Sequence, residues 1–540
     1  MKIVLAEKVS AATLAIFQQE ETWQIVTPDQ IKNGLAAELA DADALIVRSA
    51  VQADATLLES APKLRIIGRA GVGVDNIDAA AATHRGIVVM NTPGANAVAV
   101  AELTLGLMLT MARSIPRANS SMHAGKWDKK SLQGSELRGK TLGIVGLGRI
   151  GLEVARRAAS FGMTLIGYDP FVAPVIAREN GVTLVPIDDI FKSSDFLSLH
   201  VGLTTQTEGL INKQSIAIMK KGIRIINCSR GELIVDEALV EGLTSGQIAG
   251  AALDVFRQEP LKDSPYFALD NVYLSPHIAG STDEAQEAIG IQLAHQVRDY
   301  LKSGVVQNAV NVPSLSREEY VEMAPFVEMA ERLGRFLAGS LPGNLESIQL
   351  SYSGRLAQGK TDLIRNAAIA GILSGADVNR INAAAIATER GLRLTEEKKE
   401  FTTGGTGSVL KLTLHSADGV VSGSATVLHG ASPRLITLDG IDIEAPLHGT
   451  LVAIRNHDVP GVIGRIGTVL GENAINIANF ALGRSTRSRN IPEGQALAVV
   501  QIDVPTPAHA NTAVAALRKI EAVVSVRLIE LGKLPEMQVS

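Results

Sequence analysis

Three side chains that could carry out acid–base chemistry on a carboxylic acid, Arg230, Glu259 and His277, each follow closely after an apolar run. Ligands bind beyond the carboxyl ends of parallel strands, so these side chains are predicted to meet at one edge of a sheet. A carboxylate beside an imidazole fixes its tautomer and stabilises the imidazolium, which makes His277 a candidate general base. The guanidinium of Arg230 can bind a carboxylate through two hydrogen bonds. Glu259 or His277 alone would indicate an ordinary loop residue, whereas the combination favours catalysis.

A glycine motif precedes these residues. Gly146, Gly148 and Gly151 follow the apolar run 142–145, and a helical pattern and a second apolar run ending in Asp169 come next. This order is the dinucleotide-binding fingerprint, in which Gly146 permits the turn, Gly148 leaves room for the pyrophosphate and Gly151 allows close packing of the helix. Asp169 stands where an acid holds the ribose hydroxyls, and its charge repels a 2′-phosphate. The motif therefore predicts binding of NAD in preference to NADP.

Two arginines in the first hundred residues are placed in the same way. Arg48 follows the apolar run 44–47, and Arg69 follows the run 65–68 and precedes Gly71 and Gly73. These glycines would let backbone N–H groups approach an anion, although a structural turn without a ligand is the alternative. Because Arg230 lies in a later part of the chain than Arg48 and Arg69, these cations predict a substrate held between two domains.

Composition limits the classes of protein to consider. The 540 residues predict three or four domains, and 46% hydrophobic and 20% charged residues are typical of a soluble globular protein. A net charge of −5 predicts no general attraction to nucleic acid or to an anionic membrane. The single cysteine, Cys228, allows no intrachain disulfide and is expected to be a small buried packing residue of a cytoplasmic protein.

The pattern of apolar runs predicts the elements that position these residues. Short buried strands alternate with helical segments in residues 1–97 and again in 141–275, which is typical of doubly wound parallel sheets. Residues 98–116 are predicted to form one long helix joining the two domains. A helical pattern from 282 to about 302 is expected to pack back on the first domain, which makes that domain discontinuous.

The second half of the chain differs from the first. An amphipathic helix is predicted over 317–340 and strands over 409–415 and 419–428, with no catalytic cluster. From about residue 450 the order of elements is βαββαβ, the ferredoxin-like unit. The predicted fold class is α/β with two doubly wound lobes, followed by an α+β domain and this unit. The expected domains are a substrate-binding domain (1–97 and 281–312), a Rossmann domain (98–280), an intervening domain (315–449) and a C-terminal domain (450–540).

These residues resemble those of the D-3-phosphoglycerate dehydrogenase family, within the D-2-hydroxyacid dehydrogenases. The resemblance covers essentially the whole chain, including the inserted domain and a tail similar to an ACT regulatory domain, as in the long form of the enzyme. The segments that carry it begin at Ile46, Gly68, Asn91, Gly125, Gly146, Asn227, Ala252 and Ser275.

The resemblance implies an activity and a set of site residues. The activity is NAD-dependent oxidation of 3-phosphoglycerate to 3-phosphohydroxypyruvate, the first step of L-serine biosynthesis. It also implies that Lys129 or Lys130 reaches the substrate phosphate, across a subunit boundary. The implied catalytic residues are His277, Glu259 and Arg230; the cofactor residues are Gly146, Gly148, Arg149, Ile150, Gly151, Asp169 (adenosine ribose), Cys228 and Asp254 (nicotinamide amide); the substrate residues are Arg48, Arg69 and Asn96.

The tail implies regulation. Members with an ACT domain are commonly inhibited by L-serine, and Asp458 and Asn476 stand at the matching positions. A dimerisation module without a ligand is the alternative. The expected partners are a small anionic substrate, L-serine as effector and further copies of the chain in a dimer or tetramer, with no nucleic acid, membrane or metal.

Two other functions stay open at this point. The first is a dehydrogenase for another 2-hydroxy acid, such as 2-hydroxyglutarate, glycerate or lactate, which dependence on the phosphate would distinguish. The second is a non-catalytic NAD sensor, for which the complete set of Arg230, Glu259 and His277 is not needed.

Overall fold

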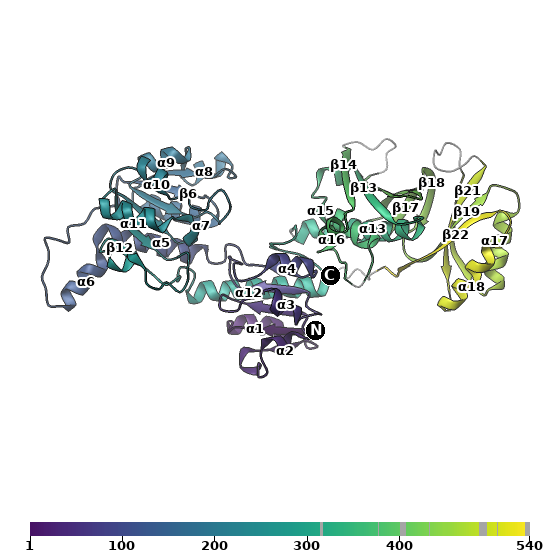
Figure 1. Cartoon of the computed structure of the whole chain (residues 1–540), viewed down its shortest axis with the longest axis horizontal. Helices are drawn as coiled ribbons and strands as arrows, with labels where there is room; N and C mark the ends of the chain where they lie inside the picture. The colour runs from purple at the N-terminus through teal and green to yellow at the C-terminus, as the bar shows by residue number, and fades with distance from the viewer. Residues whose placement is uncertain are drawn as a thin grey trace.

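The computed structural model describes residues 1–313, 317–375, 377–399, 407–430, 432–484, 494–504 and 506–534. Its strands form four sheets, and Figure 1 shows four parts arranged along the long axis of the molecule. The lobe built from residues 141–275 stands on one side of the N-terminal lobe, and the two later sheets stand together on the other side. The predicted fold class, two parallel α/β lobes followed by a mixed domain and a βαββαβ unit, is confirmed.

The first lobe is built on a five-stranded parallel sheet. Its strands are β1 (Lys2–Leu5), β2 (Gln24–Val26), β3 (Ala44–Val47), β4 (Ile66–Arg69) and β5 (Val88–Met90), in the order β2-β1-β3-β4-β5. The helices between them are α1 (Ala11–Gln18), α2 (Leu35–Leu39), α3 (Ala55–Glu59) and α4 (Ala79–His84). All four residues of β3 are buried, which accounts for its unbroken apolar sequence.

Helix α12 (Asp283–Ser303) returns to this lobe after the second lobe is complete. Thr282 caps it by accepting the N–H of Ala285 at 3.1 Å. Leu293 and Val297 of α12 are fully buried in one core with residues of β1, β3 and β4. The first lobe therefore draws on two separate stretches of the chain.

The second lobe contains a seven-stranded parallel sheet. Its strands are β6 (Thr141–Val145), β7 (Thr164–Tyr168), β8 (Thr183–Leu184), β9 (Phe196–Leu199), β10 (Ile223–Asn227), β11 (Ile248–Leu253) and β12 (Val272–Leu274), in the order β12-β11-β10-β9-β6-β7-β8. The connecting helices are α7 (Arg149–Ser160), α8 (Pro174–Glu179), α9 (Ile187–Ser193), α10 (Lys213–Ile218) and α11 (Asp236–Ser245). Strands β7 and β8 lie on one side of β6, and β9 lies on its other side. In a sheet of this kind, ligands bind beyond the carboxyl ends of the two strands where the order reverses, here β6 and β9.

The expected long helix 98–116 is two helices. α5 (Ala97–Arg113) ends where Ser114 adopts a left-handed conformation (φ 49°), and α6 (Ile115–His123) begins with Pro116 in its first turn, where proline is tolerated. Figure 1 shows α6 projecting away from the first lobe. Among the described helices, none alone has the length and apolar composition of a membrane span, although the bent pair α5 and α6 meets both criteria together.

The third part is a six-stranded mixed sheet covered by helices. Its strands are β13 (Leu345–Ser353), β14 (Arg393–Lys399), β15 (Val409–Ser416), β16 (Gly419–Leu428), β17 (Ser432–Leu438) and β18 (Ile441–Pro446), in the order β14-β13-β15-β16-β17-β18. The helices are α13 (Arg317–Ser340), α14 (Arg355–Gln358), α15 (Asp362–Ile372) and α16 (Ala383–Glu389), and α13 packs along α15. The expected start of this domain, residue 315, lies outside the described residues.

The C-terminal part has the predicted βαββαβ order. Its strands are β19 (Gly449–His457), β20 (Asn476–Arg484), β21 (Gln495–Asp503) and β22 (Val523–Gly532), in the order β20-β21-β19-β22, with helices α17 (Val462–Glu472) and α18 (Pro507–Leu517). Side chains alternate across a strand. Val452 accordingly packs in one core with α17 and α18, whereas Leu451 packs in the core of the third part. The last two sheets therefore share one core.

Candidate active site between the two lobes

His277 and Glu259 form a hydrogen-bonded pair beyond the carboxyl ends of β11 and β12. Nδ1 of the imidazole lies 2.7 Å from Oε2 of the carboxylate, and the imidazole is 51% exposed. The backbone N–H of Phe256 donates to Oε1 of Glu259 at 3.0 Å and holds this carboxylate in place. Because the carboxylate binds Nδ1, Nε2 is the ring nitrogen left to exchange a proton with a ligand.

Asp254 holds the loop that carries His277. Its side chain is completely buried and accepts hydrogen bonds from Ser275 Oγ (2.6 Å), Ile278 N (2.9 Å) and Ala279 N (2.8 Å). His277 has a φ of 52°, uncommon for a residue with a side chain, and its N–H donates to the backbone oxygen of Asp254 at 2.8 Å. The expected contact of Asp254 with the nicotinamide amide stays a prediction.

Arg230 follows β10 and reaches across the boundary between the lobes. Nη1 donates to the backbone oxygen of Ser229 at 2.7 Å. Nε lies 3.3 Å from Oδ2 of Asp75, which belongs to the loop after β4 of the first lobe. A Cβ on Gly73 would lie 2.1 Å from Nη2 of Arg230, so this approach requires a residue without a side chain. Sequence reasoning did not single out Asp75, although it directly follows the glycine loop.

Arg69 and Arg48 add positive charge on the first lobe's side of this boundary. Burial, followed by the charge of Arg230, lowers the pKa of Arg69. Its Nε is buried and has no hydrogen-bond partner among the described residues. Arg48 is half-buried, and Nη1 donates to the backbone oxygen of Lys8 at 3.3 Å. A buried guanidinium N–H without an acceptor, next to other cations, indicates a place for an anion.

Asn96, at the N-terminus of α5, lies against the loop that follows His277. A Cβ on Gly280 would be 3.1 Å from Nδ2 of Asn96. Oδ1 of Asn96 is buried and has no partner among the described residues. The structure therefore brings this expected substrate residue beside the loop that carries His277.

The glycine turn fits a dinucleotide. Gly146 has a φ of 94°, and a Cβ there would lie 2.4 Å from the backbone oxygen of His200. A Cβ on Gly151 would lie 2.0 Å from the backbone oxygen of Gly146, whereas a Cβ on Gly148 would meet nothing within 4 Å. Two glycines thus form the turn, and the third faces open space at the N-terminus of α7, where free N–H groups favour a pyrophosphate.

The other expected cofactor residues surround this turn. Asp169 connects it to the loop after β7, because Oδ2 accepts the N–H of Leu147 at 2.8 Å and Oδ1 that of Phe171 at 2.8 Å. Arg149 donates from Nη1 to the backbone oxygen of Pro93 in the segment before α5. Ile150 is half-buried against the core of the lobe.

Cys228 follows β10 and is buried as a free thiol. Burial raises the pKa of Cys228 to about 12. The thiol is therefore protonated near neutral pH and is a poor nucleophile. The prediction that Cys228 is a small buried packing residue is confirmed, while its place beside the cofactor stays a prediction.

The two expected effector residues lie at opposite ends of the C-terminal sheet. Asp458 follows β19, and its Oδ2 lies 3.3 Å from Nε of Arg484 at the end of β20. Asn476 begins β20, and Nδ2 donates to Oδ2 of Asp503 at 3.0 Å. The register pairs Asn476 with Asp503, at the end of β21 remote from His457, the last residue of β19. A single chain does not bring Asp458 and Asn476 together.

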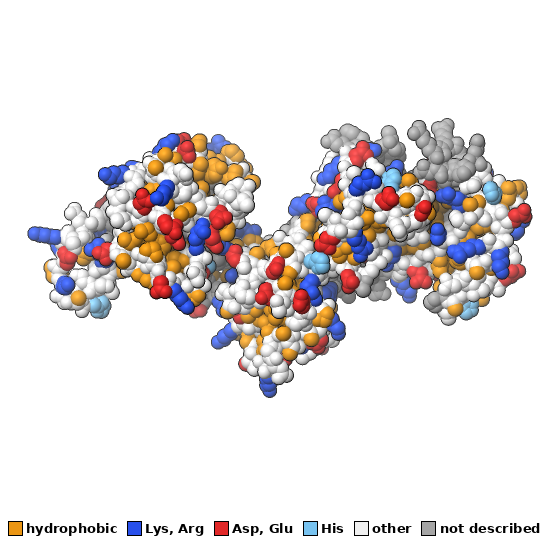
Figure 2. Space-filling view, in the orientation of Figure 1, with side chains coloured by type: hydrophobic (Ala, Val, Ile, Leu, Met, Phe, Trp, Pro, Cys, Tyr) orange, Lys and Arg blue, Asp and Glu red, His pale blue; other side chains and the backbone are white. Residues whose placement is uncertain are grey.

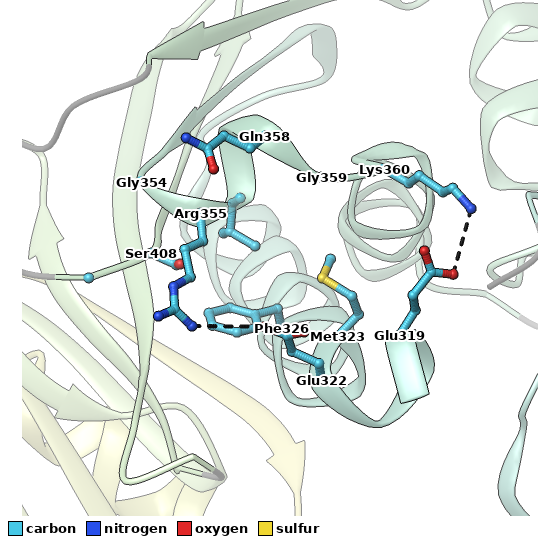
Figure 3. Close-up of a pocket in the computed structure, with 12 residues that line it drawn as sticks. Glu319, Glu322, Met323, Phe326, Gly354, Arg355, Gln358, Gly359, Lys360 and Ser408 are labelled. Atoms are coloured by element: carbon cyan, nitrogen blue, oxygen red, sulfur yellow. Dashed lines mark ion pairs between the residues drawn. The ribbon is translucent and has the colours of Figure 1, made fainter. Parts of the chain in front are cut away.

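A hollow of about 840 Å³ lies apart from this site, between the start of α13 and α14. Arg355 is 4.0 Å from Glu322 and Lys360 is 3.7 Å from Glu319, with Phe326 between the two pairs (Figure 3). Because both cations are matched by carboxylates, the hollow offers no excess of positive charge to an anion.

The surface shown in Figure 2 mixes basic, acidic and apolar side chains over every part. Lys129 and Lys130 are exposed in the segment after α6. Within the described ranges, no group of three His, Cys, Asp or Glu side chains is arranged to hold a metal ion.

Comparison with known protein families gives three matches along the chain. Residues 105–279 match the D-isomer specific 2-hydroxyacid dehydrogenase NAD-binding domain, residues 322–439 the D-3-phosphoglycerate dehydrogenase intervening domain, and residues 450–522 the ACT domain.

Similar proteins cover nearly the whole chain. The D-3-phosphoglycerate dehydrogenase of Methanocaldococcus jannaschii is 40% identical over 94% of this chain and 96% of its own length. That of Archaeoglobus fulgidus is 38% identical over 98% and 100%. Among solved structures, D-lactate dehydrogenase from Aquifex aeolicus, complexed with NAD and lactic acid, covers 58% of this chain and 100% of its own, with 28% identity and a TM-score of 0.51.

Proposed function

The chain belongs to the D-3-phosphoglycerate dehydrogenase family, and on that premise we propose that it oxidises 3-phospho-D-glycerate to 3-phosphohydroxypyruvate with NAD, the first step of L-serine biosynthesis. The observation that carries the proposal is the pairing of His277 Nδ1 with Glu259 Oε2 at 2.7 Å, in the lobe that bears the glycine turn. Oxidation of an alcohol needs such a base.

His277 takes the proton of the substrate's C2 hydroxyl on Nε2. The carboxylate of Glu259 keeps the ring in the required tautomer and stabilises the imidazolium that forms. The glycine turn with Gly148, together with Asp169, would hold NAD, which would supply the acceptor for the hydride of C2. Arg230 binds the substrate carboxylate and polarises the neighbouring oxygen with its planar fork. Asp254 keeps the His277 loop in place through its three accepted hydrogen bonds.

Arg69 and Arg48 bind the anionic groups of the substrate from the first lobe. The buried Nε of Arg69, which has no partner among the described residues, supports this role. Oδ1 of Asn96, also without a partner among them, can only accept and would therefore bind a hydroxyl of the substrate and not an anionic group. A substrate with charge at both ends thus contacts both lobes. Lys129 or Lys130 of another copy would add to the phosphate site, because both lie on the projecting segment after α6.

NADH formation with 3-phosphoglycerate tests the function. We expect unphosphorylated D-glycerate to have a far lower kcat/KM, because it lacks the group that Arg69 and Arg48 bind. Equal kcat/KM values would favour a dehydrogenase for another 2-hydroxy acid. Absence of turnover with a panel of 2-hydroxy acids would favour an NAD sensor.

We also propose that L-serine inhibits the enzyme at a site shared by two copies of the chain. β20 is an edge strand of its sheet, and antiparallel pairing with a second β20 would bring Asn476 of one copy to the Arg484 end of the other, where Asp458 lies. The assembly is accordingly a homodimer or a tetramer. Inhibition by L-serine that Asp458→Ala and Asn476→Ala each weaken, with D-serine as control, would support this site.

A cytoplasmic location is part of the proposal. It rests on a single free thiol, which needs no oxidising compartment.

A further inference from the structure

The guanidinium of Arg230 has a carboxylate partner from the opposite lobe. Oδ2 of Asp75 lies 3.3 Å from Nε of Arg230, and their side chains are 70% and 26% exposed. Arg230 follows β10 in the second lobe, whereas Asp75 follows β4 in the first. The ion pair therefore crosses the boundary between the two lobes, where the substrate is expected to bind.

Asp75 lies where a substrate carboxylate would need to bind. Nη1 of Arg230 donates to the backbone oxygen of Ser229, and Nη2 approaches Gly73 so closely that a Cβ there would be 2.1 Å away. Nε faces Asp75. A carboxylate that binds a guanidinium through two parallel hydrogen bonds uses two neighbouring N–H groups. A substrate carboxylate on the Nε side of Arg230 must therefore bind the Nε–H group that Asp75 faces.

We propose that Asp75 is a positioning residue that holds Arg230 before the substrate binds and competes with the carboxylate of the substrate for it. The inference rests on the proposed function, because it assigns the carboxylate of the substrate to Arg230. Binding then exchanges one carboxylate for another on the same guanidinium. The exchange raises the substrate KM, and the return of Asp75 to Arg230 favours release of the product.

The surrounding charges make Asp75 suited to this exchange. Arg69 carries a buried Nε without a partner among the described residues and lies within electrostatic reach of both Arg230 and Asp75. An anionic substrate that contacts Arg69 gains a hydrogen bond from this Nε, which Asp75 does not accept. Because the Asp75 side chain is mostly exposed, its displaced carboxylate regains water at little cost.

The test is Asp75→Asn in the full-length protein, with oxalate as a probe of the carboxylate site. Calorimetric titration of oxalate in the presence of saturating NADH should give a dissociation constant about two- to fivefold lower than in the wild type, the factor that corresponds to a largely exposed ion pair. The substrate KM, measured with 3-phosphoglycerate, should fall by a similar factor, while kcat stays the same or falls. A purely structural role of Asp75 would instead raise this KM.

Two controls separate this competition from general electrostatics. Glu59→Gln removes one exposed negative charge from the first lobe and should leave oxalate binding unchanged. In an Arg230→Gln background, Asp75→Asn should have no further effect on oxalate, because the guanidinium for which it competes is gone. A gain that persists in this background would overturn the proposal in favour of long-range repulsion.

The remaining outcomes are also decisive. Unchanged or weaker oxalate binding by Asp75→Asn overturns the proposal, as does a wild type that binds no oxalate. Asp75→Ser, checked by its melting temperature, replaces the Asn variant if that variant does not fold. If the wild type does not oxidise 3-phosphoglycerate, the proposed function fails, while the oxalate titrations still decide the role of Asp75.

Discussion

The proton transfer assigned to His277 depends on one nitrogen of one side chain. His277→Ala removes it, and we expect kcat to fall by about 10²–10⁴, the usual contribution of a general base. NADH binding, followed by its fluorescence, should stay the same, because the glycine turn is remote in sequence and belongs to other strands. Glu259→Gln should cost less, since an amide oxygen can still accept from Nδ1 but cannot stabilise the imidazolium. An unchanged kcat for His277→Ala would contradict the assignment.

The burial of Cys228 predicts how little its thiol reacts near and above neutral pH. Its pKa of about 12 leaves very little thiolate between pH 7 and 9, and its surface is 8% exposed. A thiol reagent should therefore not label the native protein in this range, whereas one equivalent should react after unfolding in urea. Because the chain contains a single cysteine, mass spectrometry gives an unambiguous count. Stoichiometric labelling of the native protein would show that the loop after β10 opens.

Position after a strand was the signal that made Arg230, Glu259 and His277 visible in the sequence. The structure shows why the same reasoning missed Asp75 and the loop contacts of Asp254. The partner of Asp75 lies on another lobe, so the pairing depends on how the two lobes face each other. The hydrogen bonds of Asp254 depend on the left-handed backbone conformation of His277. No pattern of residues in the sequence predicts this conformation.

At the scale of elements, two glycines of the turn before α7 have different roles, so replacing each with alanine should affect NAD binding and stability differently. Gly148→Ala places a Cβ in open space, so the melting temperature should be unchanged, while the dissociation constant of NAD should rise because the pyrophosphate needs that space. Gly151→Ala places a Cβ 2.0 Å from the backbone oxygen of Gly146 and should lower the melting temperature as well. Equal stability losses in both variants would contradict this division of roles.

Elements with long patterns could be predicted, whereas two of the shortest strands and the break in one helix could not. The strand β6 and the helix α13 occur where the apolar pattern placed them. Strands β2 and β8 have three and two residues, too few for a periodicity to register. The break at Ser114 was not predicted because the helical pattern continues through it, and Pro116 is compatible with a first turn.

At the scale of the whole molecule, the four parts are joined by specific contacts. The third part touches the first lobe where Asn379 and Asn382 donate to the backbone oxygens of Gly86 and His84, both at 3.0 Å. The third and fourth parts share a core. Leu451 and Val452 are both apolar, so the sequence alone does not indicate which element covers each face of β19.

Arg332 of α13 connects the third part to the last strand of the chain. It is 7% exposed and donates to the backbone oxygens of Leu531 (3.0 Å), Gly532 (3.2 Å) and Lys533 (2.8 Å). Arg332→Ala leaves buried acceptors without donors, which costs about 1–3 kcal/mol. Scanning calorimetry should show a lower transition temperature for the C-terminal half, while NADH formation without effector is retained.

The control is Arg335→Ala on the same helix, which removes only a half-exposed pair with Glu331 at 3.5 Å. Equal shifts in the two variants would mean that the shared apolar core alone holds the two sheets together.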